Sequence, residues 1–393
     1  MKQLKELITT LLEDNILHYW LTQMVDNKHG GFYGRRDGND LLIPESDKGA
    51  ILNARILWTF SAAYRILKKE KYLDAATRAK QYIIHHFVDH EYGGVYWSLD
   101  FKGRPVDEKK QIYAIAFVIY GMSEYARATG DTTAKEMAVR LYHDIETYAF
   151  DKVHNGYVEA LSRTWQPMGD MRLSEKDENG SRTMNTHLHI IEAYTGLLRI
   201  WKSEELKERV RNLLYIFAHH IVNPKTGHLD LFFDDQWNGQ RNIKSYGHDI
   251  EASWLLHESA LQLNEQAMLE ETNILVQRLA KAAIEGLNAD GSMIYERWET
   301  TGKVDLQRQW WVQCENVVGH LNLYQHFNNE AAAQIAQRCL DYITTYLIDR
   351  EHGEWYWSVN EKGHPNCTDD KAGFWKCPYH NSRMCFEILE REL

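Results

Sequence analysis

Three histidines lie inside segments that are otherwise apolar, where a titratable side chain is unusual. They are His187 in MNTHLHIIEAY, His248 in YGHDIEASWLLHE and His380 in FWKCPYHNSR. The ordinary pKa of an imidazole, about 6.5, lets it both accept and donate a proton near neutral pH. If the fold brings these side chains to one place, they could remove a proton from a carbon atom and return it.

Each of these histidines taken singly is more simply explained as a hydrogen-bonded residue of the core. Convergence of all three on one site would favour chemistry instead. His189 lies two residues after His187 and should point to another side of its helix, so both interpretations of His189 stay open. The pairs His85–His86 and His219–His220 lie near the ends of expected helices, where solvation or the helix dipole explains them.

An arginine and several tryptophans share these segments with the histidines. Arg55, in ILNARILW, would be costly to bury without an anion or a partner, which favours a functional role. The flat rings of Trp254, Trp311 and Trp375 suit the apolar faces of sugars, although large aromatic residues also commonly fill space. Further substrate-binding candidates at the same helix starts are Tyr113, Asn185, Glu251 and Glu315.

A cluster of histidines could also bind a metal ion, but the usual ligand patterns are missing from the sequence. There is no HExxH motif, no Cys/His zinc spacing and no Asp-rich calcium loop. Asp369 and Asp370 are adjacent, yet they lack companion ligands at a suitable spacing. We therefore expect no metal.

The elements that must position these residues recur along the chain. Short stretches such as GGVYWSLDFKGRP and GEWYWSVNEKGHP alternate aromatic, aliphatic and polar residues between turns, which predicts β-hairpins. One glycine marks each unit, and successive units are 63, 62, 71, 64 and 62 residues apart. These glycines are Gly31, Gly94, Gly156, Gly227, Gly291 and Gly353. A repeat of this length is a stronger indicator of the architecture than any other feature of the sequence.

Between consecutive hairpins there is room for two helices, one apolar on nearly all sides and one with a single apolar stripe. The expected helices lie near 2–24, 47–68, 70–87, 108–129, 131–148, 180–200, 203–221, 246–264, 266–286, 307–326, 329–348 and 372–391. We expect an all-α, closed (α/α)6 barrel formed by residues 1–393 as a single domain, with the apolar helices inside. An open solenoid is the alternative, but no segment resembles a polar terminal cap.

Composition excludes several classes of function. The net charge of −11 is spread among interspersed acidic and basic residues, so we expect no nucleic-acid partner and no membrane association. No signal-peptide pattern begins the sequence, and no apolar run is long enough to span a bilayer. The five cysteines are odd in number and include no CxxC pair, which favours a cytoplasmic protein. Closure of the barrel favours a monomer.

The longest step in the repeat contains an insertion, QPMGDMRLSEKDENG, which begins at Gln166. A polar, glycine-containing loop on one face of a repeat fold is often a lid. We therefore expect residues 166–180 to cover the site.

Four motifs in this order resemble the N-acylglucosamine 2-epimerase superfamily, and within it most closely the cellobiose 2-epimerase branch. They are MNTHLHIIEAYT, SYGHDIEASWLL, WWVQCENVVG and FWKCPYHNSR, and the similarity covers essentially the whole chain. The resemblance implies the (α/α)6 fold and interconversion of glucose and mannose at the reducing end of a β-1,4-linked disaccharide. It also implies that no metal or nucleotide cofactor is needed.

The same resemblance implies roles for individual residues. His248 and His380 would be the acid and base at C2, acting on a ring-opened sugar through an enediolate. Arg55, His187, Glu251, Trp254, Trp311, Glu315 and Trp375 would be further functional positions. The choice among cellobiose, mannobiose and lactose stays open.

Other functions are compatible with such a barrel. A glycoside hydrolase would need a pair of carboxylates at the mouth, where histidines dominate instead. A non-catalytic glycan-binding protein would keep the tryptophans but would have no reason for facing histidines. An aldose–ketose isomerase would share the enediolate and differ only in where the proton returns.

Overall fold

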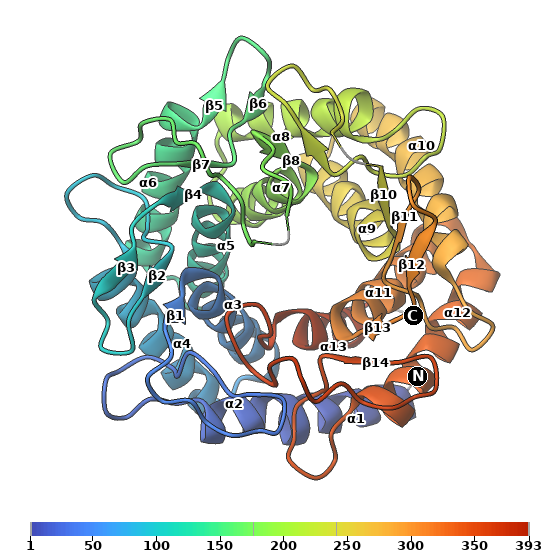
Figure 1. The fold of residues 1–393 in the computed structure, drawn as a ribbon, viewed down its shortest axis with the longest axis horizontal. Helices are drawn as coiled ribbons and strands as arrows, with labels where there is room; N and C mark the ends of the chain where they lie inside the picture. The colour runs from blue at the N-terminus through green and yellow to red at the C-terminus, as the bar shows by residue number, and fades with distance from the viewer. Residues whose placement is uncertain (1, 176, 241, 392–393) are drawn as a thin grey trace.

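The computed structural model describes residues 2–175, 177–240 and 242–391. Six inner helices stand around a common axis, and each contacts the next (Figure 1). Contact between the last and the first closes the ring. The inner helices are α3 (Ala50–Leu67), α5 (Ile112–Thr129), α7 (Met184–Leu198), α9 (Tyr246–Leu263), α11 (Trp310–Phe327) and α13 (Tyr379–Glu390). This arrangement confirms the predicted (α/α)6 barrel.

An outer layer of helices surrounds this ring (Figure 1). Five of its members each follow an inner helix: α4 (Glu70–Tyr82), α6 (Thr132–Tyr148), α8 (Glu204–Ile216), α10 (Gln266–Ala283) and α12 (Glu330–Tyr342). The sixth is built from the start of the chain, α1 (Lys2–Thr10), a π-helical segment Leu11–Leu17 and α2 (His18–Gln23). Because α1 packs on α13, the two ends of the chain form the sixth helix pair.

Residue patterning explains which helix lies inside. In α3 every residue from Ala50 to Ala63 is buried, including polar ones, whereas α4 buries a single stripe that contains Tyr72, Ala76 and Ala79. Side chains cap the free backbone amides at the start of several helices. Asp131, for example, is the N-cap of α6 and accepts a hydrogen bond from the Ala134 N–H. The width of the apolar face of each helix therefore determines whether that helix lies in the inner or in the outer layer.

Each repeat begins with a hairpin whose two arms pair through a narrow bridge. These bridges join Val25 to Phe32, Val88 to Val95, Phe150 to Tyr157, Val222 to Leu229, Leu287 to Met293 and Ile348 to Trp355. In the third repeat the bridge widens into β5 (Phe150–Asp151) and β6 (Gly156–Tyr157). The predicted hairpin repeat is therefore present in all six units.

Short strands also join each repeat to the next. The antiparallel pairs are β1 (Lys48–Gly49) with β2 (Ser98–Leu99), β4 (Lys110–Gln111) with β7 (Ala160–Leu161), β8 (Arg182–Thr183) with β9 (Phe232–Phe233), β10 (Ile243–Ser245) with β11 (Glu296–Trp298), and β13 (Arg308–Gln309) with β14 (Ser358–Val359). A bridge between Arg36 and Ala372 completes the circle. Two outer strands, β3 (Pro105–Asp107) and β12 (Lys303–Asp305), extend these pairs. The pairs hold the starts of all six inner helices at one end of the barrel, which we call the mouth.

Buried ion pairs hold some hairpins against the strands that precede the inner helices. Lys48 Nζ lies 2.8 Å from Asp26 Oδ2, and Lys110 Nζ lies 2.8 Å from Asp89 Oδ2. Burial alone would raise the pKa of Asp26, but Lys48 and two turn amides hold that pKa below its usual value. The turn is therefore tied to the helix start by charge as well as by backbone pairing.

The expected helix starts were wrong in two respects. Several inner helices begin about three residues later than predicted, because β1, β4, β8 and β13 occupy those positions. The last helix begins at Tyr379 instead of 372, since Pro378 disfavours helical geometry in the residue before it and lacks an amide hydrogen. None of the helices in the described part of the chain combines the length and apolar character needed to cross a lipid bilayer.

Candidate active site

The mouth is where the inner helices stop being completely buried. Asn185 on α7, His248 on α9 and Trp375 before α13 are all half-buried, although their neighbours in sequence are mostly buried. The Oδ1 atom of Asn185 is buried and has no hydrogen-bond partner among the described residues. These features point to a site that a polar ligand would complete.

His248 lies in the first turn of α9. Its Nδ1 is hydrogen-bonded to the Ser245 hydroxyl at 2.7 Å, and its ring centroid lies 4.7 Å from that of Trp311. Burial, and then repulsion from His189 and His380, lower the pKa of His248 to about 3. The ring is therefore neutral, and the contact with Ser245 leaves Nε2 available to a ligand.

His380 lies in the first turn of α13 and is close to the same tryptophan ring. Its ring centroid is 5.7 Å from Trp311, and its Nδ1 donates to Glu315 Oε1 at 2.6 Å. Burial lowers the pKa of His380 to about 3, although the Glu315 carboxylate opposes that shift. The structure thus brings His248 and His380, which are 132 residues apart in sequence, to the same indole ring.

The prediction that His187 joins this site is wrong. Its Nδ1 donates to the Thr183 carbonyl at 2.7 Å, and its Nε2 accepts the Tyr157 N–H at 3.0 Å. The ring is fully buried against Trp237, and burial lowers its pKa to about 3. Both ring nitrogens are hydrogen-bonded to backbone groups, so His187 connects α7 to its hairpin. We call this pair of contacts the His187 clamp.

The repeat explains that clamp. Asp249 and Gln313 stand at the corresponding position, four residues after the last residue of the preceding strand, on α9 and α11. Asp249 accepts the Leu229 N–H at 2.9 Å, and Gln313 accepts the Met293 N–H at 2.8 Å. Aligning the repeats would therefore have identified His187 as structural from the sequence.

His189 takes the place that was expected of His187. Its ring lies 5.0 Å from that of Tyr113 and 4.7 Å from that of Phe117, and its Nδ1 donates to Glu192 Oε2 at 2.7 Å. Burial lowers the pKa of His189 in spite of the Glu192 carboxylate. Two residues along a helix turn the side chain by about 200°, which is why one histidine faces the hairpin and the other faces the mouth.

Arg55 is buried beside His189, and no carboxylate among the described residues forms an ion pair with it. Its Nη2 donates to the Tyr113 hydroxyl at 2.9 Å, and its Nη1 lies 3.8 Å from Cys377 Sγ. Burial raises the pKa of both of these partners, so they stay neutral. The guanidinium also lies 4.2 Å from the Phe117 ring centroid, and its Nε has no partner in the described part of the chain. A buried cation in this state attracts negative charge.

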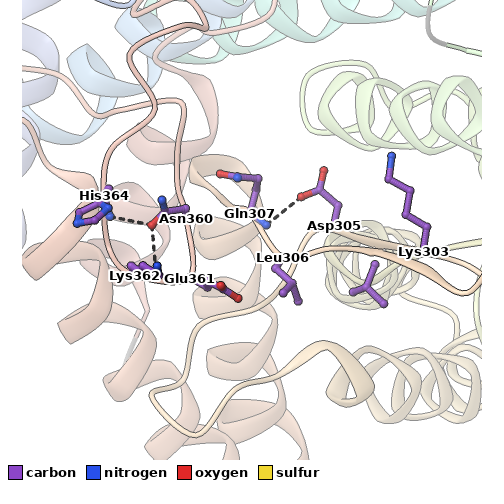
Figure 2. A pocket seen from close by; sticks show the side chains of 9 residues that line it. Lys303, Asp305, Leu306, Gln307, Asn360, Glu361, Lys362 and His364 are labelled. Carbon is purple, nitrogen blue, oxygen red and sulfur yellow. Dashed lines mark hydrogen bonds between the residues drawn. The ribbon is translucent and has the colours of Figure 1, made fainter.

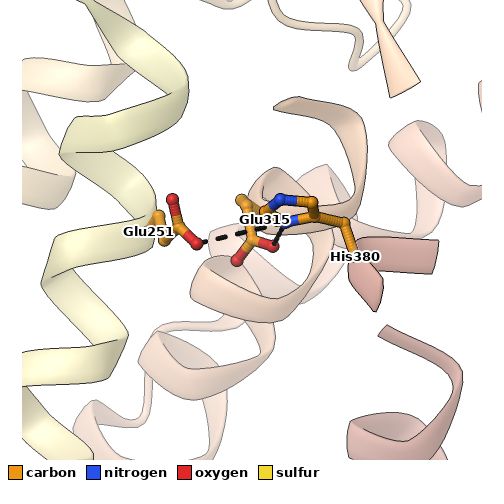
Figure 3. Close-up of side chains that lie close together, drawn as sticks. All are labelled: Glu251, Glu315 and His380. Atoms are coloured by element: carbon orange, nitrogen blue, oxygen red, sulfur yellow. Dashed lines mark hydrogen bonds and ion pairs between the residues drawn. The ribbon is translucent and has the colours of Figure 1, made fainter. Parts of the chain in front are cut away.

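A group of acidic residues lies beneath the histidines. Glu251, Glu315 and His380 each offer a ligand atom, and these atoms lie within 4.8 Å of one another (Figure 3). Arg383 already occupies this acidic group, because its Nη2 donates to Glu251 Oε1 and to Glu315 Oε1, both at 2.7 Å. A metal ion would have to displace that guanidinium.

The pKa values of the two carboxyls in this group are shifted in opposite directions. Burial and the neighbouring Glu315 charge raise the pKa of Glu251, whereas Arg383 and His380 outweigh burial and lower the pKa of Glu315. Protonation is therefore easier at Glu251 than at Glu315. Glu315 stays ionised, and it lies beneath His380 in the barrel. Arg383 was not among the residues expected from the sequence, since nothing in the FWKCPYHNSR motif distinguishes it from a surface arginine.

The three expected tryptophans differ in their surroundings. Trp254 is buried, with Nε1 donating to Glu315 Oε2 at 2.9 Å, so it supports the acidic group from below. Trp311 is close to both His248 and His380, and its Nε1 donates to Gln309 Oε1 at 3.0 Å. Trp375 is on a loop, not on an inner helix, and packs 6.0 Å from Trp97. Of this aromatic pair, Trp375 is half-buried and Trp97 is buried beneath it in the core.

The insertion after β7 crosses toward the second repeat. Lys109 Nζ donates to the Arg172 carbonyl at 3.1 Å, and Gln111 Nε2 donates to the Met171 carbonyl at 3.1 Å. Lys109 Nζ also lies 5.0 Å from the Trp97 ring centroid. Residue 176 of the expected lid, 166–180, lies outside the described residues. The loop is therefore tied next to the aromatic pair, where a lid would act.

A separate groove of about 620 Å³ lies between residues 303–307, which include β12, and residues 360–364, which follow β14 (Figure 2). It is lined by Lys303, Val304, Asp305, Leu306, Gln307, Asn360, Glu361, Lys362 and His364. This lining shares no residue with the histidine cluster and includes no tryptophan, tyrosine or phenylalanine on which a sugar could stack. The groove is therefore not part of the candidate site.

Comparison with known proteins places these features in a family. Residues 31–383 match the model of the N-acylglucosamine 2-epimerase (GlcNAc 2-epimerase) family. The chain is 54% identical to a cellobiose 2-epimerase of Bacteroides fragilis, over 98% of each chain, and 39% identical to one of Ruminococcus albus, over 97% of each. The solved structure of the cellobiose 2-epimerase from Bacillus thermoamylovorans is 41% identical, covers 100% of both chains and superposes with a TM-score of 0.94.

Proposed function

Because the chain belongs to the N-acylglucosamine 2-epimerase family, we propose that it is an enzyme of the cellobiose 2-epimerase type. It interconverts glucose and mannose at the reducing end of β-1,4-linked disaccharides. The observation that carries the mechanism is that two imidazoles, those of His248 and His380, lie close to the same Trp311 ring.

Inversion at C2 requires the sugar ring to open, since only the free aldehyde makes the C2 hydrogen acidic. The imidazole that acts as the base is neutral, as the lowered pKa values of both rings favour, and removes this proton from one face. The other imidazole must carry a proton on Nε2 at that moment, and it returns this proton to the opposite face and becomes neutral. Exchange of protons with water then restores both rings for the next turnover. Each such proton transfer is typically worth about 10² to 10⁴ in rate.

The intermediate is an enediolate, whose negative charge is shared by the C1 and C2 oxygens. Arg55 suits this charge because its own partners, Tyr113 and Cys377, are neutral. His189 faces the same place and can exchange a proton with these oxygens during ring opening. A single well-placed donor to such an oxyanion contributes about 10² to 10³ in rate.

The second sugar of the disaccharide needs a platform that stays in place while the reacting carbon turns. Trp375, which packs against the buried Trp97, supplies a half-buried flat ring, and Asn185 supplies an unpaired acceptor for a sugar hydroxyl. Glu251, when protonated, can donate to another hydroxyl. The 166–180 loop, tied beside Trp97, can exclude water from the enediolate.

The setting of the enzyme is also part of the proposal. Five cysteines are free thiols, four of them buried, which suits a reducing cytoplasm. Residues 1–393 act as a single catalytic domain and a monomer. Size-exclusion chromatography with light scattering at micromolar concentration tests this; a dimer would contradict it.

Incubation with cellobiose in D₂O, followed by NMR, tests the proposed reaction. Deuterium at C2 together with a mannose residue at the reducing end is the expected result. A fructose residue there would indicate an isomerase, free monosaccharides a hydrolase, and saturable binding without conversion a glycan-binding protein. Each of these last three outcomes would contradict the proposal.

A further inference from the structure

A buried polar network joins His189 on α7 to His380 on α13, two helices on opposite sides of the ring (Figure 1). Glu192 accepts from His189 Nδ1 at 2.7 Å, as Glu315 accepts from His380 Nδ1 at 2.6 Å. One arginine serves both carboxylates: Arg383 donates through Nη1 to Glu192 and through Nη2 to Glu315. The two histidines therefore have the same kind of support.

Glu192 has the geometry of a group that orients an imidazole. Its other oxygen accepts from the Tyr379 hydroxyl and from Arg383, so the carboxylate is held at three points and cannot rotate away. Its side chain is only 2% exposed, which makes each of these contacts stronger than it would be in water. A carboxylate on Nδ1 selects the tautomer with a free Nε2 and increases the basicity of the ring.

We propose that Glu192 is a positioning residue for the epimerisation: it holds His189 in one tautomer and orientation, with Nε2 toward the sugar. This inference rests on the proposed function. Because Glu192 and Glu315 share Arg383, the support of His189 is also electrostatically linked to that of His380. Glu192 is buried, and its carboxylate is bonded to His189, Tyr379 and Arg383, so it acts through His189.

The variant Glu192→Gln tests this role, and Glu146→Gln is its matched control. Glu146 on α6 is also a buried glutamate that accepts from two tyrosines, Tyr157 at 2.8 Å and Tyr194 at 2.7 Å. It likewise pairs with an arginine, with Arg209 Nε at 2.7 Å, but the structure gives it no contact with a histidine. The two variants therefore remove the same charge from similar surroundings.

We expect Glu192→Gln to lower kcat at least about tenfold with KM within about twofold, since general acid–base steps are worth about 10² to 10⁴. Because the carboxylate raises the pKa of His189 against burial, its loss should also move the acidic limb of the kcat/KM profile to lower pH. Glu146→Gln should change neither quantity. An unchanged profile in Glu192→Gln, or the same change in both variants, would overturn the inference.

Glu192→Asp provides the test if the glutamine variant does not fold. It keeps the charge but shortens the side chain, so the carboxylate no longer reaches His189 Nδ1. We expect kcat to fall while the melting temperature stays near that of the wild type; a wild-type kcat would overturn the inference. A wild-type enzyme that does not epimerise cellobiose would instead refute the proposed function and would leave the role of Glu192 without a reaction to serve.

Discussion

The two ends of the inner helices hold charged residues in opposite states. At the end far from the mouth, basic and acidic side chains are paired: Arg65 Nε lies 2.5 Å from Glu124 Oε1, Arg391 Nη2 lies 2.7 Å from Glu387 Oε2, and Arg199 contacts Glu258. At the mouth, Arg55 has only neutral partners. One ring of helices therefore carries a satisfied end and an unsatisfied end.

This difference shows where the molecule does its chemistry. At the far end, the Arg65–Glu124 and Arg199–Glu258 pairs join neighbouring inner helices, and the Arg391–Glu387 pair lies at the end of α13. The mouth keeps a buried cation, neutral imidazoles and an unpaired amide oxygen, and each of these gains a partner when a sugar binds. Departures from full pairing are expected where function requires them.

The largest expected effect is at the unpaired cation. Arg55→Met should lower kcat/KM about 10² to 10³, because the enediolate loses its donor. Steady-state kinetics with cellobiose measure this effect, and circular dichroism confirms the fold. The matched control is Arg199→Met at the far end, which should keep wild-type kinetics; equal losses in the two variants would contradict the distinction between the ends.

The next effect separates two histidines of α7 that are close in sequence. His187→Ala should lower the free energy of unfolding by about 2 to 4 kcal/mol, since two buried hydrogen bonds and their packing are lost. His187→Gln should keep most of the activity, because glutamine performs the same task at Gln313. His189→Gln should lose activity with little change in stability. Urea unfolding and kinetics check these three variants, and a catalytic defect in His187→Gln would refute the clamp.

A pH effect on stability is expected from Glu159, which lies below the lid. Burial raises the pKa of Glu159 from 4.5 to about 7, despite hydrogen bonds from Thr183 and Thr186. A raised carboxyl pKa means that the folded state binds more protons than the unfolded state, so stability falls as pH rises from about 4.5 to 7.

Glu159→Gln should remove this dependence and should be more stable than the wild type at pH 8, by on the order of 2 kcal/mol. Urea denaturation at pH 5 and pH 8 measures the difference. A wild type whose stability does not fall across this range would show that Glu159 is ionised in the folded protein.

The smallest effect is expected at the far end. Arg199→Met should change the free energy of unfolding by less than about 1 kcal/mol, because both members of the Arg199–Glu258 pair are partly exposed and screened by solvent. Thermal unfolding measures this change. A loss of several kcal/mol would mean that the far-end pairs hold the ring closed to a greater degree than their exposure indicates.

Much of the fold follows from local pattern, because a hairpin signal every 62 to 71 residues and two kinds of apolar face are visible in the sequence. The strands before the inner helices were missed, since pairs of two residues have no periodicity of their own. Tyr379 as the start of α13 was missed because the apolar pattern continued through Pro378.

The site was less predictable than the fold. The segments were right, but the choice between His187 and His189 depends on which face of α7 turns toward the hairpin, and the apolar residues around them do not mark it. Glu192 and Arg383 are far apart in sequence, and only closure of the ring brings them together. Residues that act through such contacts carry no local signal.

The most direct test of the account is exchange of the C2 proton by variants that keep one of the two bases. His248→Asn and His380→Asn, each incubated with cellobiose and separately with its mannose epimer in D₂O, can be followed by NMR. We predict that each variant exchanges the C2 hydrogen of one epimer only, a different one in each case, and does not epimerise either sugar. Near-normal epimerisation by either variant would contradict a mechanism with two histidines facing one carbon.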